Sequence, residues 1–218
     1  MNKLSTTANI NYFLNRRKIN IDISFRCPLQ CPKCQRQNRY LDYGKKVPGR
    51  DLTLNEIDKI SNFYNFFSFC GQYSDPVHHP QFIEILKMLY NKNVGCEVHN
   101  AASQKSKEYF TKCFKANPSA QWVFAIDGLP EESHKYRINQ DGKKIFDVMC
   151  ESKKHLLKKP TWQYIIFRYN EDHIEQAKKM AKDIDVNFLL IQSSRWDKED
   201  PNKDLYKPKN KELGLNAH

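Results

Sequence analysis

The 218-residue sequence has no long hydrophobic run, and this absence excludes several classes of protein. No stretch approaches the ~18 consecutive apolar residues that a membrane-spanning helix needs. Residues 1–18 lack the apolar segment of a secretory signal peptide, and the sequence has no internal repeat and no low-complexity segment. We therefore expect a cytoplasmic protein with no membrane partner. In that reducing compartment its seven cysteines serve as metal ligands or as core residues.

What the sequence does have is positive charge, and it is unevenly distributed. The net charge is +11, and residues 1–50 contain eleven Lys or Arg against two Asp. Such an excess can steer an anionic substrate, either nucleic acid or an acidic peptide. It can equally be a solvated basic face that offsets the charge of a thiolate-ligated metal site, because no aromatic-rich nucleic-acid motif accompanies it. The residues concerned are ten of these eleven, namely Arg16, Arg17, Lys18, Arg26, Lys33, Arg36, Arg39, Lys45, Lys46 and Arg50.

Six short β-rich segments alternate with helical patterns. The predicted strands cover residues 19–25, 66–71, 94–99, 121–126, 161–167 and 186–191. Helical spacing is found over 80–92, 105–115, 144–158 and 171–184, and Thr53 with Glu56 has the form of a capping box that starts a further helix running to residue 66. Strands that alternate with helices of this length form parallel βαβ units. The sequence therefore predicts an α/β fold with parallel strands in a single domain.

We expect this domain to span residues 19–194, after an N-terminal extension of residues 1–18. Residues 195–218 form a C-terminal tail that carries mixed charge, Pro201 and Pro208. Such a composition is typical of a loosely packed extension.

Three cysteines, Cys27, Cys31 and Cys34, follow the first predicted strand with the spacing C-x3-C-x2-C. Three thiolates on one loop can bind three irons of a four-iron cluster and leave the fourth iron without a protein ligand. The alternative is a zinc knuckle in a basic nucleic-acid-binding module. Structural zinc needs four protein ligands, however, and the next candidate, Cys70, is distant in the sequence. We expect the remaining cysteines to be buried thiols, namely Cys70, Cys96, Cys113 and Cys150.

The cysteine spacing resembles the cluster motif of the radical S-adenosylmethionine (SAM) enzymes. The resemblance extends over about residues 19–192 and implies a partial (β/α)6 barrel, whose active site lies at the carboxyl ends of the strands. In this family the amino and carboxylate groups of SAM bind the fourth iron of a [4Fe-4S] cluster. An aromatic residue usually precedes the third cysteine, and its backbone contacts the adenine. Here that position is Lys33.

The ends of the second and third predicted strands resemble further parts of the family more loosely. The sequence CGQYSDP at residues 70–76 stands where the family has the Gly-Gly-Glu-Pro motif, which binds the ammonium group of SAM. Backbone carbonyls of the turn would be acceptors for that group. The segment after the third strand stands where many relatives have a Thr-Asn-Gly turn. The implied SAM contacts are Gly71, Gln72, Tyr73, Asp75, Asn100 and Ser103.

The segment FAIDGLPEESHKYR at residues 124–137 resembles the radical SAM enzymes that modify peptides and proteins, many of which carry a C-terminal SPASM domain. Those enzymes have Ser-Ile-Asp-Gly followed by His-Asp-x-x-Arg, in which the serine contacts the ribose of SAM and the arginine its carboxylate. The resemblance implies the second role for Arg137, because a guanidinium donates to a carboxylate with two prongs. Ala125 replaces the serine, and Asp127 is the candidate to accept from a ribose hydroxyl instead.

Two further groups of candidates lie at the barrel mouth. In relatives an apolar residue of the fifth strand packs on the adenine, and Ile166 is the candidate here, with Phe167 as the alternative. After the sixth strand, Arg195 and Trp196 are candidates for substrate contact.

The resemblance implies that a reduced [4Fe-4S] cluster cleaves SAM to a 5′-deoxyadenosyl radical, which abstracts hydrogen from a substrate. Segment 124–137 favours a peptide or protein side chain as the substrate, whereas the basic first third favours RNA, a nucleotide or another phosphorylated molecule. A one-electron donor such as flavodoxin or ferredoxin is the implied partner. One of the remaining cysteines is a candidate hydrogen donor to a substrate radical. No cysteine follows Cys150, so we expect no SPASM or twitch extension. The Lys- and Asn-rich composition suggests a compact genome such as a phage's.

Overall fold

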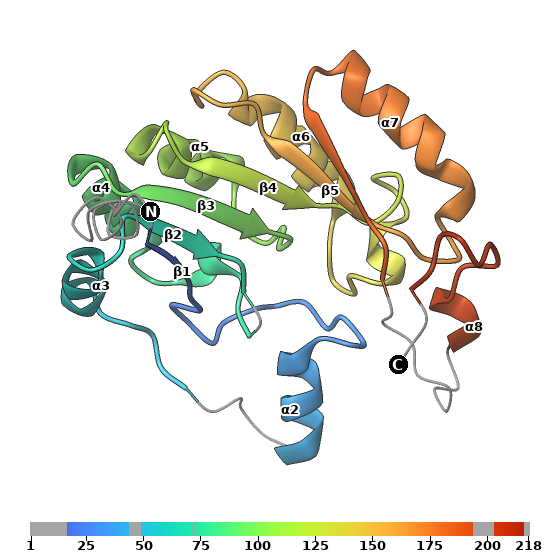
Figure 1. Ribbon diagram of the computed structural model, residues 1–218, viewed down its shortest axis with the longest axis horizontal. Helices are drawn as coiled ribbons and strands as arrows, with labels where there is room; N and C mark the ends of the chain where they lie inside the picture. Colours follow the sequence, from blue (N-terminus) through green and yellow to red (C-terminus); the bar gives the residue numbers. More distant parts are fainter. Residues whose placement is uncertain (1–16, 44–48, 72, 194–202, 216–218) are drawn as a thin grey trace, which may run out of the picture.

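The computed structural model describes residues 17–43, 49–71, 73–193 and 203–215. In this part of the chain six parallel strands form one sheet, and their order in the sheet is their order in the sequence (Figure 1). The predicted single-domain α/β fold with parallel strands is therefore confirmed. The strands are β1 (Lys18–Asn20), β2 (Phe66–Phe69), β3 (Gly95–Asn100), β4 (Gln121–Ala125), β5 (Thr161–Ile165) and β6 (Asn187–Ile191).

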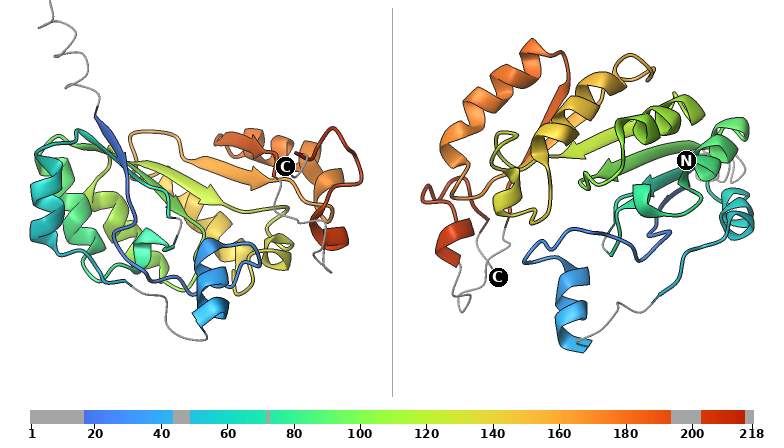
Figure 2. Two further views of the ribbon diagram at one scale, coloured as in Figure 1. Left: turned by 60° about the horizontal axis from the view of Figure 1, so that its bottom comes forward. Right: turned by 180° about the vertical axis from the view of Figure 1, so that it is seen from behind.

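Helices connect successive strands and cover one face of the sheet, as Figure 2 shows from behind. Helix α2 stands away from the sheet, on the side toward which the strands point (Figure 1). None of the helices in the described ranges has the length and apolar character needed to cross a membrane. The α-helices are α2 (Gln35–Tyr43), α3 (Leu54–Ser61), α4 (Phe82–Asn91), α5 (Lys107–Ala116), α6 (Gly142–Ser152), α7 (Ile174–Asp183) and α8 (Lys203–Tyr206). The 3-10 turns are η1 (Pro76–His78), η2 (Ser133–Lys135) and η3 (Glu171–His173).

The main core lies between the sheet and the helices. Alternate residues of each strand point into it, including Phe67, Val98, Trp122 and Tyr164, all of which are fully buried. Because side chains alternate along a strand, the residues between them point to the concave face of the sheet. On β3 these are Glu97 and His99. The concave face is therefore the polar side of the sheet, and a smaller apolar cluster covers it only toward the carboxyl ends of the strands.

The first strand is shorter than predicted. Ile21 still donates its backbone N–H to Ser68, but the carbonyl of Ile23 accepts from Leu52, which belongs to the segment before α3. The chain thus leaves the sheet after Asn20. Residues 21–34 are free to run across the carboxyl ends of the strands and carry the three motif cysteines there.

Local capping confirms the predicted start of α3. Thr53 accepts from the backbone N–H of Glu56, and the Glu56 side chain accepts from the backbone N–H of Thr53, as in a capping box. The helix ends at Ser61, earlier than predicted, because Asn65 and Phe66 donate their N–H groups to the carbonyl of Arg17 and so enter the sheet.

The described part of the C-terminal tail is packed, which corrects the expectation of a loose extension. Tyr206 of α8 is buried in the apolar cluster of the concave face, and its carbonyl accepts from Arg168. The carboxylate of Glu171 accepts from the backbone N–H groups of Lys209 and Asn210. These contacts attach residues 203–215 beside β5 and β6. The segment is mostly polar, and the buried Tyr206 ring and the Glu171 carboxylate hold it in place.

Candidate active site

The loop of residues 21–34 carries the cysteines and is held by segments that follow other strands. The N–H of Gln30 donates to the carbonyl of Ile138 at 3.1 Å, and the side-chain amide of Asn139 donates to the carbonyl of Pro28 at 3.2 Å. At its start, the carbonyl of Arg26 accepts from Asp75 at 2.9 Å. The loop is thereby fixed over the ends of β2 and β4.

One pocket at this edge of the sheet brings together eight of the residues that the sequence singled out. It opens between the cysteine loop, the loop after β2, the end of β3 and the segment after β4. The eight residues are Cys27, Cys31, Lys33, Cys34, Gly71, Asp75, Asn100 and Arg137.

The cysteine thiols lie in largely apolar surroundings. Cys31 is buried in the small cluster with Leu29, Tyr136 and Phe167, and Cys27 and Cys34 pack against the same cluster. Burial raises the pKa of the Cys27 thiol well above its ordinary value, and the neighbouring Asp75 carboxylate raises it further. Each of these effects disfavours a bare thiolate, so an ionised sulfur at this position needs a positive partner.

Asp75 ties the loop after β2 to the end of β3. Its buried carboxylate accepts from the backbone N–H groups of Ala101 and Ala102, both at 2.8 Å, and from the side-chain amide of Asn100 at 3.1 Å. Val77 donates to the same carboxylate. These donors already occupy the Asp75 carboxylate, so they compete with its predicted contact to a ligand ammonium group. The backbone carbonyls of the loop remain suited to bind that ammonium group.

Gly71 permits a turn that no side chain could enter. A Cβ atom at this position would collide with the carbonyl oxygen of Ser74. Asp22 fixes the turn from the other side, accepting from the N–H of Tyr73 and from the N–H and hydroxyl of Ser74. The sequence analysis missed Asp22, although a charged residue inside the apolar segment 19–25 was a signal for it.

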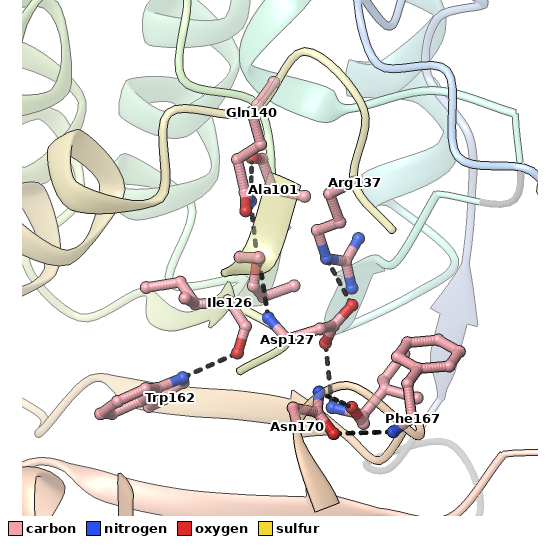
Figure 3. A network of polar contacts seen from close by, with 12 residues as sticks. Ala101, Ile126, Asp127, Arg137, Gln140, Trp162, Phe167 and Asn170 are labelled. Carbon is pink, nitrogen blue, oxygen red and sulfur yellow. Dashed lines mark hydrogen bonds and ion pairs between the residues drawn. The ribbon is translucent and has the colours of Figure 1, made fainter. Parts of the chain in front are cut away.

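Arg137 reaches the pocket from the segment after β4, and Asp127 orients it (Figure 3). Its Nε lies 2.8 Å from Oδ2 of Asp127, with the N–H not aligned on the oxygen. The other oxygen, Oδ1, accepts from the N–H of Ile165 at 2.9 Å. The Asp127 charge raises the pKa of the buried Arg137 against the opposing effect of burial, and Cys31 adds to this rise. Arg137 is thus a fixed positive charge beside a motif cysteine.

Amide and indole groups lock the ends of β3, β4 and β5 around this pair (Figure 3). The Gln140 amide donates to the carbonyls of Ala101 and Ala125, and the Trp162 indole donates to the carbonyl of Ile126. Asn170 accepts from Phe167 and donates to Ile165. The Gln140 and Trp162 groups each join separate chain segments, and Asn170 closes the turn that follows β5.

Four predicted ligand contacts lie outside the pocket lining. Asp127 is fully buried and has both carboxylate oxygens engaged, so it acts on the pocket through Arg137. Ser103 accepts from Asp141, which begins α6, and the N–H of Tyr73 donates to Asp22. Ile166 points into the main core, whereas Ile165 and Phe167 belong to the cluster beside the cysteines. The further predicted contacts Gln72, Arg195 and Trp196 lie outside the described residues.

Cys70 and His99 are among the pocket residues that the sequence analysis did not assign to it. His99 forms an ion pair with Glu97, with Nε2 and Oε1 2.9 Å apart. Strand alternation places Glu97 and His99 on the same face, but the sequence could not tell which face was concave.

In the described ranges, no three Cys, His, Asp or Glu side chains are grouped to bind a single metal ion. In a four-iron cluster, each motif cysteine would bind a different iron. That assignment stays a prediction.

No protein-family model matches the chain, and no curated protein matches it either. Among solved structures, Streptococcus suis SuiB bound to S-adenosylmethionine superposes with a TM-score of 0.66 and 12% identity, over 93% of this chain and 46% of SuiB. SuiB bound to its precursor peptide SuiA gives 0.65 and 11%, over 84% and 42%. Methylornithine synthase (PylB) gives 0.59 and 15%, over 92% and 60%.

The fold of this chain is therefore the partial barrel of SuiB and PylB, the barrel of radical SAM enzymes. The chain spans less than half of the SuiB chain. At these identities the likeness concerns the fold alone.

Proposed function

We propose that this chain is a radical SAM enzyme, in which Cys27, Cys31 and Cys34 bind a [4Fe-4S] cluster and the adjoining pocket binds SAM. One observation carries the proposal: the three motif cysteines share a pocket with Arg137 and the Gly71 turn, at the carboxyl ends of the strands. Ligands of parallel α/β folds bind at this end of the strands. The match to SuiB, which was solved with SAM, supports the same interpretation.

The surroundings of the cysteines fit an iron–sulfur cluster. Soft thiolate ligands in an apolar shell are the donor set that such clusters use. A cluster bound by three thiolates is negatively charged, and the fixed charge of Arg137 beside Cys31 offsets part of that charge. The Asp75 carboxylate, which lines the same pocket as the cysteines, is engaged by backbone donors.

The rest of the pocket fits the amino-acid end of SAM. Oδ1 of Asn100 is buried without a hydrogen-bond partner among the described residues, because the amide is turned to donate to Asp75. A ligand amino or hydroxyl group would satisfy this acceptor. Since Asp127 engages Nε of Arg137, the two terminal nitrogens of the guanidinium are the groups suited to a ligand carboxylate.

When bound, the cluster and SAM would supply the reductive cleavage that produces a 5′-deoxyadenosyl radical for hydrogen abstraction. The chain's own residues hold, orient and shield these groups. The Gly71 turn brings backbone carbonyls to the pocket, Asp127 fixes the guanidinium of Arg137, and Leu29 and Tyr136 limit access of water to the thiols.

We propose a peptide or protein as the substrate and the cytoplasm as the location, with a one-electron donor as partner. SuiB was solved with a precursor peptide, which supports a peptide substrate. The competing preference for an anionic substrate rested on the basic first third of the chain. Within it, Arg26 pairs with Asp51 and Arg50 pairs with Glu56, so two of these charges are already neutralised.

Anaerobic reconstitution with iron and sulfide tests this proposal. We expect four irons per chain and, after addition of SAM and dithionite, 5′-deoxyadenosine detected by mass spectrometry. Cys31→Ser should lose both, whereas Cys150→Ser, on α6 outside the pocket, should keep both. A single zinc in place of iron, with RNA binding that weakens steeply with salt, would instead establish the basic nucleic-acid-binding module.

A further inference from the structure

The three residues between Cys27 and Cys31 form a spacer that one distant segment holds. This segment, residues 136–139, contains Arg137 and precedes Gln140 (Figure 3). Every spacer residue contacts it: the Pro28 carbonyl accepts from the side-chain amide of Asn139 at 3.2 Å, the Leu29 side chain shares an apolar cluster with Tyr136, and the Gln30 N–H donates to the Ile138 carbonyl at 3.1 Å. Because the spacer joins two of the proposed cluster ligands, this segment determines where both sulfurs lie.

The peptide group between Pro28 and Leu29 connects this segment to a cysteine sulfur. Its carbonyl accepts from Asn139, and its N–H, which belongs to Leu29, faces the sulfur of Cys27 as a hydrogen-bond donor. The C=O and N–H of a trans peptide group point in opposite directions. The Asn139 amide and the sulfur therefore lie at opposite ends of one peptide group, and each hydrogen bond polarises the other.

The Leu29 N–H acts against the other influences on Cys27. Burial and then the Asp75 carboxylate raise the pKa of this thiol, whereas the Leu29 N–H lowers it. A donor with this effect stabilises negative charge on the sulfur. A cysteine that binds iron is a thiolate, and hydrogen bonds to such sulfurs help to set the reduction potential of a cluster.

The backbone of Asn139 is held in the conformation that this contact needs. Its φ is 74°, in the left-handed region that asparagine tolerates better than most residues. Its carbonyl accepts from the side chain of Gln104, in the loop after β3, at 2.6 Å. The next residue, Gln140, donates to the carbonyls of Ala101 and Ala125. Two side-chain amides thus tie Asn139 and its neighbour to the ends of β3 and β4.

We propose that Asn139 is a positioning residue: it holds the spacer between the first two motif cysteines, so that both keep their places at the cluster and the Leu29 N–H stays directed at the Cys27 sulfur. This inference rests on the proposed function and adds a residue that sets the stability and the reduction potential of the metal centre.

The direction of the effect follows from charge. The reduced cluster carries one more negative charge than the oxidised cluster, so a hydrogen bond to a ligand sulfur stabilises the reduced form more and raises the potential. Asn139 acts in this role through the peptide group and does not itself bind the metal. Loss of its amide should therefore loosen the spacer and make the cluster harder to reduce.

Iron release tests this role without SAM and without turnover. The protein is reconstituted anaerobically, a chelator is added, and the loss of the cluster absorbance is followed with time. Asn139→Gly removes the amide and keeps the turn, because glycine adopts positive φ freely. We expect this variant to release iron several-fold faster than the unchanged protein. Its reduction potential, titrated with dithionite and mediator dyes, should be more negative.

Asn93→Gly is the matched control. Asn93 also has a positive φ, 54°, but it lies between α4 and β3, at the end of the sheet opposite to the cysteines. This variant should match the unchanged protein in iron release and in potential. Urea unfolding of both variants without iron shows whether either substitution disturbs the fold itself. Asn139→His, which tolerates a positive φ and retains an N–H donor, should restore slow iron release.

The outcomes separate this inference from the proposed function. Equal iron release and equal potential in Asn139→Gly and Asn93→Gly overturn the role of Asn139 and leave the proposed function standing. A loss of stability in urea with an unchanged potential assigns Asn139 a structural role only, which also overturns the inference. If Asn139→Gly does not fold, Asn139→Asp, which keeps the shape and lacks the donor, takes its place with the same expectations. Failure of the unchanged protein to bind a four-iron cluster counts against the proposed function, and the inference falls with it.

Discussion

Asp127 carries its charge into a fully buried position, where Arg137 approaches one carboxylate oxygen and the N–H of Ile165 donates to the other. Removing one partner of a buried ion pair leaves an uncompensated charge and costs about 3–5 kcal/mol. We therefore expect Arg137→Ala to lower the free energy of unfolding in urea by about this amount. A stability loss below about 1 kcal/mol would show that water solvates the carboxylate when the guanidinium is removed.

The double variant Asp127→Asn/Arg137→Gln provides the control for this prediction. Because it removes both charges, it should cost less than the sum of the single variants. It should nevertheless bind SAM weakly, since the guanidinium group that would bind the ligand carboxylate is gone. Stability and ligand binding are thereby measured separately on the same pair.

Gly71 offers a second test at this scale. Because a Cβ atom would collide with the backbone of Ser74, Gly71→Ala should open the turn, break the hydrogen bonds to Asp22 and destabilise the protein by about 1–3 kcal/mol. Binding of S-adenosylhomocysteine, measured by calorimetry, should weaken as well. Gly95→Ala is the matched control, because its Cβ would collide with the ring edge of Phe66 and not with backbone, and it should leave ligand binding unchanged.

The sequence was sufficient to predict the pocket residues that belong to a motif. It was not sufficient for the residues that line the pocket because of the side of the strand on which they lie. Cys27, Cys31, Cys34 and Arg137 were identifiable because their spacing is a local property. Which of the neighbouring residues at the end of β5 faces the pocket depends instead on the twist of the whole sheet. The sequence analysis proposed Ile166, with Phe167 as the alternative. Ile166 points into the main core, whereas Ile165 and Phe167 belong to the cluster beside the cysteines.

At the scale of elements, the ion pair between Glu97 and His99 lies on the polar face of β3, and the Ser68 hydroxyl joins it to β2. The pKa of His99 is raised from 6.5 to about 9, so its contribution to stability is complete below about pH 6.5 and is lost as the pH rises through about 9. The pKa of Glu97 is lowered from 4.5 to about 2, so its contribution is complete above about pH 4.5 and is lost toward pH 2.

We therefore predict that the stability difference between the unchanged protein and Glu97→Gln is largest between about pH 4.5 and 6.5 and decreases by about pH 9.5. Urea unfolding at several pH values measures it. A difference that is constant across this range would mean that the pair does not change its protonation between the folded and unfolded states.

Elements with a strong local signal were predicted well, and those that depend on tertiary contacts were not. The capping box of Thr53 and the six strands follow from propensity and alternation. The early end of β1 depends on Leu52, because its N–H donates to the carbonyl of Ile23 in place of a neighbouring strand. Helix α2 is mostly polar and stands away from the sheet, so it has too few apolar residues for the pattern by which the other helices were predicted.

At the scale of the whole molecule, residues 203–215 complete the apolar cluster on the concave face. Tyr206 packs edge-on against Tyr136 and Phe167, with ring centroids 5.3 and 5.9 Å apart. Tyr206→Ala should therefore cost about 2–4 kcal/mol of unfolding free energy. Leu205→Ala, whose side chain is 59% exposed, should change it by less than about 0.5 kcal/mol. Equal effects of the two variants would contradict this packing.

The sheet order has a consequence for synthesis on the ribosome. Each strand lies beside the one made just before it, so the sheet can grow unit by unit as the chain emerges. The cysteine loop is the exception, because the side chain of Asn139 that holds Pro28 is translated 111 positions later. A nascent chain halted before β4 thus presents all three motif thiols without this anchor. We expect metal loading to follow translation of the segment after β4 rather than the appearance of the cysteines themselves.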